Sequence, residues 1–113
     1  MTVKGTPAAA TIALNQDEPE NFCRPAVDPM LRSIAGVYGS KVLVVILTGM
    51  GSDGQLGCRQ FAEQGSTIIA QDEATSTVWG MPGAVATTGL CNEILPLLEI
   101  GDRISQIATG KRF

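Results

Sequence analysis

The first strong pattern of apolar and polar residues lies between positions 25 and 38. Its apolar residues recur every three or four positions and are Val27, Leu31, Ile34, Ala35 and Tyr38. That spacing predicts a helix with one buried face. Asp28 and Pro29 suit its first turn, where a carboxylate meets the positive end of the helix dipole and a missing N–H costs little. Gly39 follows at a position where helices usually end.

The next pattern is continuous rather than alternating. Residues 41–47 are one lysine followed by a run of valine, leucine and isoleucine, which is typical of a strand buried on both faces of a parallel sheet. We expect this strand at the centre of the fold. A glycine-rich turn at 48–54 leads into a second helix and then a strand at 67–70, an order that predicts a parallel pair with a right-handed crossover. Gly54 and Gly57 should let the helix lie close to the sheet.

Weaker patterns fill the rest of the chain. They predict a small, polar segment at 2–10 with no assigned element, a short strand at 11–14, loops at 15–21 and 72–81, a short helix at 82–87, a brief edge strand at 93–97, a helix at 99–108 and a frayed tail at 109–113. Together the elements predict a single α/β domain over residues 1–113, with a doubly wound, mainly parallel sheet and flanking helices.

The composition agrees with a folded domain. Hydrophobic residues make up 44% of the 113 residues, which argues against intrinsic disorder. Charged residues make up only 17%, so we expect part of the surface to be covered by a partner or by more chain. The longest aliphatic run, 42–47, is far shorter than the roughly 18 residues that cross a bilayer, and the N-terminus lacks a secretion signal. We therefore expect a cytoplasmic protein without membrane insertion.

The histidine and cysteine content limits the chemistry. The chain has no histidine, the commonest general base near neutral pH, and its three cysteines lack the short C-x-x-C spacing of zinc and redox sites. We expect no metal, no cofactor and free, buried thiols. The net charge of −3, the scattered basic residues and the few aromatic residues argue against nucleic-acid binding.

The glycine turn admits two interpretations. In the first, Gly49, Gly51 and Gly54 form a G-x-G-x-x-G string between a strand and a helix, and Asp72 follows near the end of the next strand. This order is typical of a Rossmann-like dinucleotide-binding module, in which backbone N–H groups hold the diphosphate and the acid binds the ribose. Against it, Asp53 would place a carboxylate beside the phosphates, with no cation near it in sequence to compensate.

In the second interpretation, Asp53 is the reason for the turn. Its carboxylate would lie at the carboxyl end of a parallel strand and at a helix N-terminus, where it would orient another group and offset its charge. The glycines would bend the chain sharply and leave backbone N–H groups free to bind an oxyanion. A simple helix cap is the less specific alternative for Asp53.

Four strings in the chain point to a known family. They are residues 21–28 (Asn-Phe-Cys-Arg-Pro-Ala-Val-Asp), 47–54 (Leu-Thr-Gly-Met-Gly-Ser-Asp-Gly), 70–76 (Ala-Gln-Asp-Glu-Ala-Thr-Ser) and 80–82 (Gly-Met-Pro). In this order they resemble the catalytic domain of the CheB-type protein-glutamate methylesterases, over most of the chain from residue 11 to 104. Ala26 is a small departure, because the family commonly has serine there. The resemblance implies a serine hydrolase with a Ser-His-Asp triad, which hydrolyses glutamate methyl esters on receptors and deamidates certain glutamines.

The resemblance implies roles for residues in and near the glycine turn. Asp53 matches the triad acid, and the backbone N–H of Met50 matches a donor to the oxyanion. The candidates for the lining of the cleft are Gly49, Gly51, Trp79 and Met81. For two side chains a structural role is the alternative: Met50 would fill the core, and Trp79 would pack at the sheet edge.

The resemblance also implies what this chain lacks. In the family the serine and the histidine precede the region matched here, so we expect the chain to be the C-terminal part of the catalytic domain and to have no methylesterase activity alone. The expected partners are a methylated chemoreceptor as substrate, an upstream methylesterase half and, in the parent protein, a receiver domain.

Overall fold

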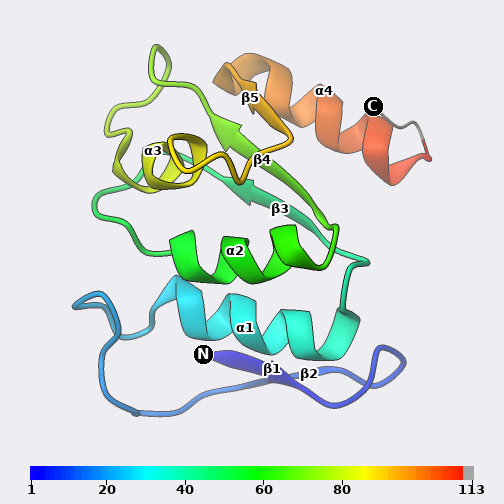
Figure 1. Ribbon diagram of the computed structural model, residues 1–113. Coiled ribbons are helices and arrows are strands. Elements are labelled where there is room, and N and C mark those ends of the chain that lie inside the picture. Colours follow the sequence, from blue (N-terminus) through cyan, green and yellow to red (C-terminus); the bar gives the residue numbers. More distant parts are fainter. Residues whose placement is uncertain (111–113) are drawn as a thin grey trace.

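The computed structural model describes residues 1–110, which form two sheets and four helices (Figure 1). The elements are β1 (Thr2–Lys4), β2 (Thr11–Ala13), α1 (Val27–Tyr38), β3 (Leu43–Ile46), α2 (Gln55–Glu63), β4 (Thr67–Gln71), α3 (Gly80–Ala86), β5 (Glu93–Leu95) and α4 (Leu97–Ala108). Strands β1 and β2 form an antiparallel pair, whereas β3, β4 and β5 form a parallel sheet in the order β3-β4-β5. The expected α/β class with a mainly parallel sheet is confirmed.

The parallel sheet is most buried at its central strand, β4. Ile68 and Ile69 point to opposite faces, and both are fully buried, so protein covers both faces of this strand. Helices α2, α3 and α4 all contact β4. Strand β3 pairs with β4 alone among the described residues, so the expectation that it lies at the centre was wrong for this region. A continuous aliphatic run indicates burial but does not distinguish a central strand from an edge strand.

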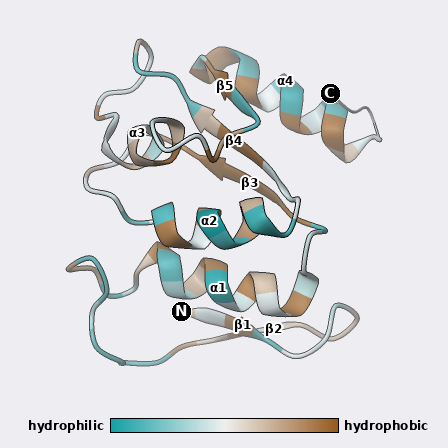
Figure 2. Ribbon diagram, in the orientation of Figure 1, coloured by the Kyte–Doolittle hydropathy of each residue, from teal (hydrophilic) through white to brown (hydrophobic). Residues whose placement is uncertain are grey.

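Helices α1 and α2 pack side by side between the β1–β2 hairpin and the parallel sheet (Figure 1). A Cβ atom at Gly57 would lie 2.5 Å from the Cβ atom of Leu31 on α1. Gly57 therefore allows the two helices to approach each other, and not, as the sequence analysis expected, α2 to approach the sheet. Hydrophobic residues are concentrated on β3 and β4 (Figure 2), and Phe61 of α2 is fully buried against this core.

The β1–β2 hairpin forms a separate layer outside the parallel sheet. Thr2 pairs with Ala13, and the N–H of Val3 donates to the hydroxyl of Ser33 on α1 at 2.8 Å. The strand expected at 11–14 is therefore present but antiparallel, and its partner β1 was missed. Each strand has only three residues, so its hydrophobic periodicity and composition are too short to predict a strand reliably from the sequence.

The last third of the chain follows the expected order with shifted boundaries. Helix α3 begins at Gly80 rather than 82, and α4 begins at Leu97 rather than 99. Thr109 and Gly110 continue the end of α4 through backbone hydrogen bonds to Ser105 and Ile107, whereas residues 111–113 of the expected frayed tail lie outside the described residues. None of the helices within residues 1–110 has the length and apolar character needed to cross a membrane.

Candidate active site

The carboxylate of Asp53 lies on the turn between β3 and α2 and is only 5% exposed. Its Oδ2 accepts the N–H of Val27 at 2.6 Å, and its Oδ1 accepts the N–H of Asp28 at 3.0 Å. A third donor, the side-chain amide of Asn21, lies 2.9 Å from Oδ1. A helix N-terminus does hold Asp53, as expected, but it is that of α1 and not that of the helix that follows. Gly54, which caps α2, provides no side chain for this purpose.

The hydrogen bonds of Asp53 leave part of the carboxylate unused. A carboxylate offers about four acceptor positions, two on each oxygen. Among residues 1–110, two groups donate to Oδ1 and one group donates to Oδ2. Asp53 is thus oriented by three donors and retains one acceptor position on Oδ2.

Asp28 is a second buried carboxylate beside the first, with 1% of its surface exposed. Its Oδ1 accepts the N–H of Gly57, in the first turn of α2, at 2.8 Å. Its Oδ2 accepts the side-chain amide of Asn21 at 2.9 Å. The sequence predicted Asp28 in the first turn of its own helix and indicated no role for Asn21. The one signal for both residues was that they begin and end the string 21–28.

The backbone around Met50 faces outward. Its side chain is 83% exposed, so the alternative that it fills the core was wrong. Its N–H has no acceptor within residues 1–110. Gly49 fixes the turn on one side: its N–H donates to the carbonyl of Val78 at 3.0 Å, and its carbonyl accepts the N–H of Met81 at 2.9 Å. A free backbone N–H on a fixed turn is the kind of donor that an oxyanion requires.

The four candidate lining residues lie around this turn in different ways. Gly51 has a φ of +87°, which favours glycine, and its backbone lies so close to Gly80 that a Cβ there would be 2.8 Å from the Gly51 carbonyl oxygen. A Cβ at Gly49 would lie 2.7 Å from the sulfur of Met81. Met81 in turn lines a hollow of about 340 Å³ along β3.

Trp79 is half-buried and connects α3 to the end of β4. Its indole N–H donates to the carbonyl of Gln71 at 3.0 Å, and a Cβ at Gly83 would lie 2.9 Å from its ring. These contacts match the alternative of packing at the sheet. A role in lining a cleft stays a prediction for all four residues.

Gln71 is a buried residue of this site that the sequence analysis missed. Its side-chain oxygen accepts the N–H of Thr48 at 2.8 Å, and its side-chain nitrogen donates to the carbonyl of Thr75 at 2.8 Å. Gln71 therefore connects the start of the glycine turn to the loop after β4. An amide side chain at the end of a buried strand was the available signal, because a buried amide needs partners.

Asp72 and the glycine turn do not form the arrangement that the dinucleotide interpretation requires. The Oδ1 atom of Asp72 accepts the backbone N–H of Thr75 at 3.0 Å and its hydroxyl at 2.6 Å, so this carboxylate closes its own loop. Asp53 places a carboxylate in the turn itself, where a diphosphate would have to lie. The geometry does not favour dinucleotide binding.

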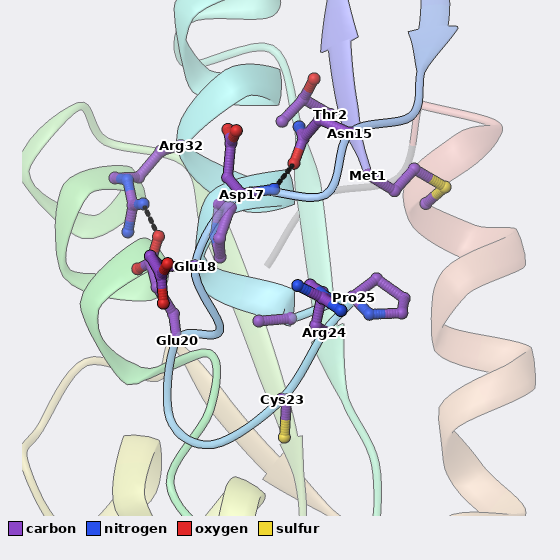
Figure 3. Close-up of a pocket in the computed structure, with 12 residues that line it drawn as sticks. Met1, Thr2, Asn15, Asp17, Glu18, Glu20, Cys23, Arg24, Pro25 and Arg32 are labelled. Carbon is purple, nitrogen blue, oxygen red and sulfur yellow. Dashed lines mark hydrogen bonds and ion pairs between the residues drawn. The ribbon is translucent and has the colours of Figure 1, made fainter.

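The loop that delivers Asn21 is attached to α1 by an ion pair. The guanidinium of Arg32 lies 2.6 Å from the carboxylate of Glu20, and the two side chains border a hollow of about 220 Å³ (Figure 3). The hydrogen bond from Arg32 lowers the pKa of the Glu20 carboxyl, and the same bond raises the pKa of Arg32. The ion pair holds the chain one residue before Asn21.

The three cysteines differ in exposure and in the pKa of their thiols. Cys23 is exposed and Cys91 is half-buried, so the expectation of three buried thiols was right for Cys58 alone. Burial raises the pKa of Cys58 to about 12 and that of Cys91 to about 11, which disfavours their thiolate forms. No group of three or more histidine, cysteine, aspartate or glutamate side chains within residues 1–110 is arranged to hold a metal ion.

Comparison with known proteins gives a consistent result. The profile of the CheB methylesterase family matches residues 1–104. The chain is 66% identical over 101 residues to the protein-glutamate methylesterase/protein-glutamine glutaminase of group 2 operon from Rhodospirillum centenum. This match covers 89% of this chain and 26% of that protein. It is 56% identical over 111 residues to protein-glutamate methylesterase/protein-glutamine glutaminase 1 from Paramagnetospirillum magneticum, with 98% and 29% covered.

A solved structure has the same fold. The catalytic domain of the Thermotoga maritima CheB methylesterase superposes with a TM-score of 0.89 at 36% sequence identity. The match covers 94% of this chain and 56% of that domain. The chain therefore spans somewhat more than half of the solved domain and between a quarter and a third of the two relatives.

Proposed function

Because the chain belongs to the CheB methylesterase family, we propose that it supplies the triad acid and an oxyanion donor to a protein-glutamate methylesterase. Asp53 is the proposed acid, and the backbone N–H of Met50 is the proposed donor. One observation carries the proposal: a single turn presents a buried carboxylate with an open acceptor position on Oδ2 and, three residues earlier, an N–H with no acceptor in residues 1–110.

The proposed reaction follows the general order of serine hydrolases. A serine hydroxyl attacks the carbonyl of the glutamate methyl ester, and a histidine takes the serine proton. Asp53 accepts the other ring N–H of that histidine, which selects its tautomer and offsets the charge of the imidazolium. The Met50 N–H stabilises the negative oxygen of the tetrahedral intermediate. Methanol leaves, and water then releases the free glutamate from the acyl-enzyme.

The same site accounts for a second activity. The two relatives are described as protein-glutamine glutaminases as well as methylesterases. In that reaction the serine attacks a side-chain amide, ammonia replaces methanol as the leaving group, and the acyl-enzyme and its hydrolysis are the same. We infer that Asp53 and Met50 serve both reactions, because an ester and an amide develop the same oxyanion.

The chain has no histidine, so in this proposal the histidine and the nucleophilic serine come from outside the 113 residues. An oxyanion donor and an acid without the histidine give little rate, so the chain alone should be inactive. The proposed substrate is a methylated chemoreceptor, and the proposed location is the cytoplasm. An upstream methylesterase half and a receiver domain are the proposed partners.

A chimeric enzyme tests this proposal. In the Rhodospirillum centenum relative, the matching segment is replaced by this chain, and methanol release from a methylated chemoreceptor fragment is measured. We expect an active chimera, a fall in kcat of about 10³- to 10⁴-fold in Asp53→Asn, and no change in the exposed control Asp102→Asn. The 113-residue chain alone should release no methanol above the blank.

Two results would contradict the proposal. The first is an Asp53→Asn chimera with activity within about threefold of the unsubstituted chimera, since loss of a triad acid costs far more. The second is methanol release by the purified chain alone, because this would require a complete site within residues that contain no histidine.

A further inference from the structure

We propose that Asn21 is a positioning residue for Asp53, an inference that rests on the proposed role of Asp53 as the triad acid. Asn21 lies 32 positions before Asp53 in the chain, on a turn that belongs to no helix or strand. Its side-chain amide joins Asp53 to Asp28, the two buried carboxylates at the adjoining ends of α1 and α2.

The geometry of the amide explains why asparagine suits this position. The Nδ2 atom of Asn21 lies 2.9 Å from Oδ1 of Asp53 and 2.9 Å from Oδ2 of Asp28. An amide nitrogen carries two hydrogen atoms, so each carboxylate receives one. An oxygen in the same place would face two negatively charged acceptors without a proton to share. The donor thus separates like charges that would otherwise repel each other in a buried environment.

The contact also fixes the direction in which the open acceptor position of Asp53 faces. Asn21 and the N–H of Asp28 both donate to Oδ1, whereas only the N–H of Val27 donates to Oδ2. Rotation of the carboxylate plane about its Cβ–Cγ bond would turn the open acceptor position in another direction, and the bond from Asn21 opposes this rotation. Asn21 therefore keeps the open acceptor position on Oδ2, where the proposed histidine N–H would bind.

The backbone is bent in an unfavourable way to deliver this amide. Glu20 and Cys23 exchange backbone hydrogen bonds of 3.1 and 2.9 Å, and the two residues between them have φ values of +53° (Asn21) and +62° (Phe22). This matches a type I′ turn, in which asparagine is favoured first and glycine second. Phe22 is instead fully exposed and gains nothing from packing. The turn points the amide of Asn21 inward and the ring of Phe22 into solvent.

Three substitutions in the chimeric enzyme described above test the inference. Asn21→Ala removes the donor, Asn21→Asp keeps the shape but replaces the donor with an acceptor, and Phe22→Gly keeps the turn and changes only the neighbouring residue. We expect kcat to fall about tenfold in Asn21→Ala and at least as far in Asn21→Asp, with KM within twofold. Phe22→Gly should keep the kcat of the unsubstituted chimera.

The order of the two Asn21 variants separates positioning from a purely structural role. Aspartate adopts a positive φ more readily than alanine, so a role in the turn alone predicts that Asn21→Asp is the more active variant. A donor role predicts the opposite order. An Asn21→Asp chimera as active as the unsubstituted one, or more active than Asn21→Ala, would overturn the inference.

A second measurement, on the 113-residue chain, keeps the inference testable if a chimeric variant fails to fold. The amide protons of Val27 and Asp28 donate to Asp53, and their exchange with solvent is measured by NMR. We expect exchange at least tenfold faster in Asn21→Ala than in Phe22→Gly. Equal rates would contradict the positioning role. If the Asp53→Asn chimera keeps full activity, the proposed function fails. If the Asn21 variants keep full activity and Asp53→Asn loses it, only the inference on Asn21 fails.

Discussion

Asp28 caps α2, and Asp53 caps α1, so each of the two carboxylates caps the helix beside the other. Asp28 belongs to α1, and its carboxylate accepts the N–H of Gly57 in the first turn of α2. Asp53 directly precedes the cap of α2, and its carboxylate accepts the first two N–H groups of α1, those of Val27 and Asp28. The exchange satisfies N–H groups that each helix leaves unpaired at its start, and it locks the two N-termini together. The site therefore depends on the packing of two helices.

Loss of the Asp28 carboxylate should destabilise the fold. Asp28→Ala leaves the buried N–H of Gly57 and one hydrogen of the Asn21 amide without a partner. We expect the free energy of unfolding in urea to fall by about 2 to 4 kcal/mol. Asp102→Ala on the exposed side of α4 is the control and should change it by less than about 0.5 kcal/mol. An equal effect in both variants would show that the exchange of caps does not stabilise the protein.

The close contact between α1 and α2 should not tolerate a side chain at Gly57. A Cβ there would lie 2.5 Å from the Cβ of Leu31, so Gly57→Ala must push the helices apart, at a cost of about 1 to 3 kcal/mol in unfolding free energy. Gly101, inside α4, has nothing within 4 Å of an added Cβ. Gly101→Ala should therefore stabilise the protein by about 0.5 to 1 kcal/mol. Stabilisation by both substitutions would contradict the described packing.

The three thiols should differ in reactivity. Burial raises the pKa of Cys58 to about 12 and of Cys91 to about 11, so both remain neutral at pH 8, whereas Cys23 is exposed. A disulfide reagent at pH 8 should modify one thiol quickly and the other two only after unfolding; Cys23→Ser should abolish the fast reaction. Fast modification of two or three thiols would contradict the burial of Cys58 and the partial burial of Cys91.

The same pKa shifts make the free energy of unfolding depend on pH. In the unfolded chain these thiols lose their protons near the ordinary value of 9.0, whereas in the folded protein they keep them until about pH 11 to 12. The folded state thus binds more protons in this range, and the free energy of unfolding should decrease as the pH rises from about 9 to 12. Cys58→Ala and Cys91→Ala together should flatten that decrease.

The ion pair between Arg32 and Glu20 should be detectable as a lowered pKa of Glu20 in an acid titration. Arg32 lowers the pKa of Glu20 below its ordinary value of 4.5, so the folded state keeps this carboxylate ionised at a pH where the unfolded chain protonates it. The resulting stabilisation is present above pH 4.5 and is lost as the pH falls through the lowered pKa. An NMR titration of Glu20 should show the shift, and Arg32→Gln should move the pKa back toward 4.5. An unchanged titration in Arg32→Gln would exclude the ion pair in solution.

The sequence by itself determined the elements whose signal is local. The spacing of Leu31 and Ala35 predicted α1, and the aliphatic run at 41–47 predicted a strand of a parallel sheet, because each pattern depends only on the period of its own element. The order of glycines around Asp53 also singled out the turn that carries this buried carboxylate. The sequence also indicated the protein family, because four short strings, one of which contains this turn, resemble those of the family.

Only the tertiary structure decided what Asp53 contacts. Its three donors come from residues 25 to 32 positions away, and neither Asn21 nor Asp28 has a local pattern that relates it to the glycine turn. The role of Gly57 was likewise invisible, since the closeness of two helices depends on how their faces meet. Hydrophobic period reports which face of an element is buried, whereas hydrogen bonds between distant residues follow from the packing of the assembled fold.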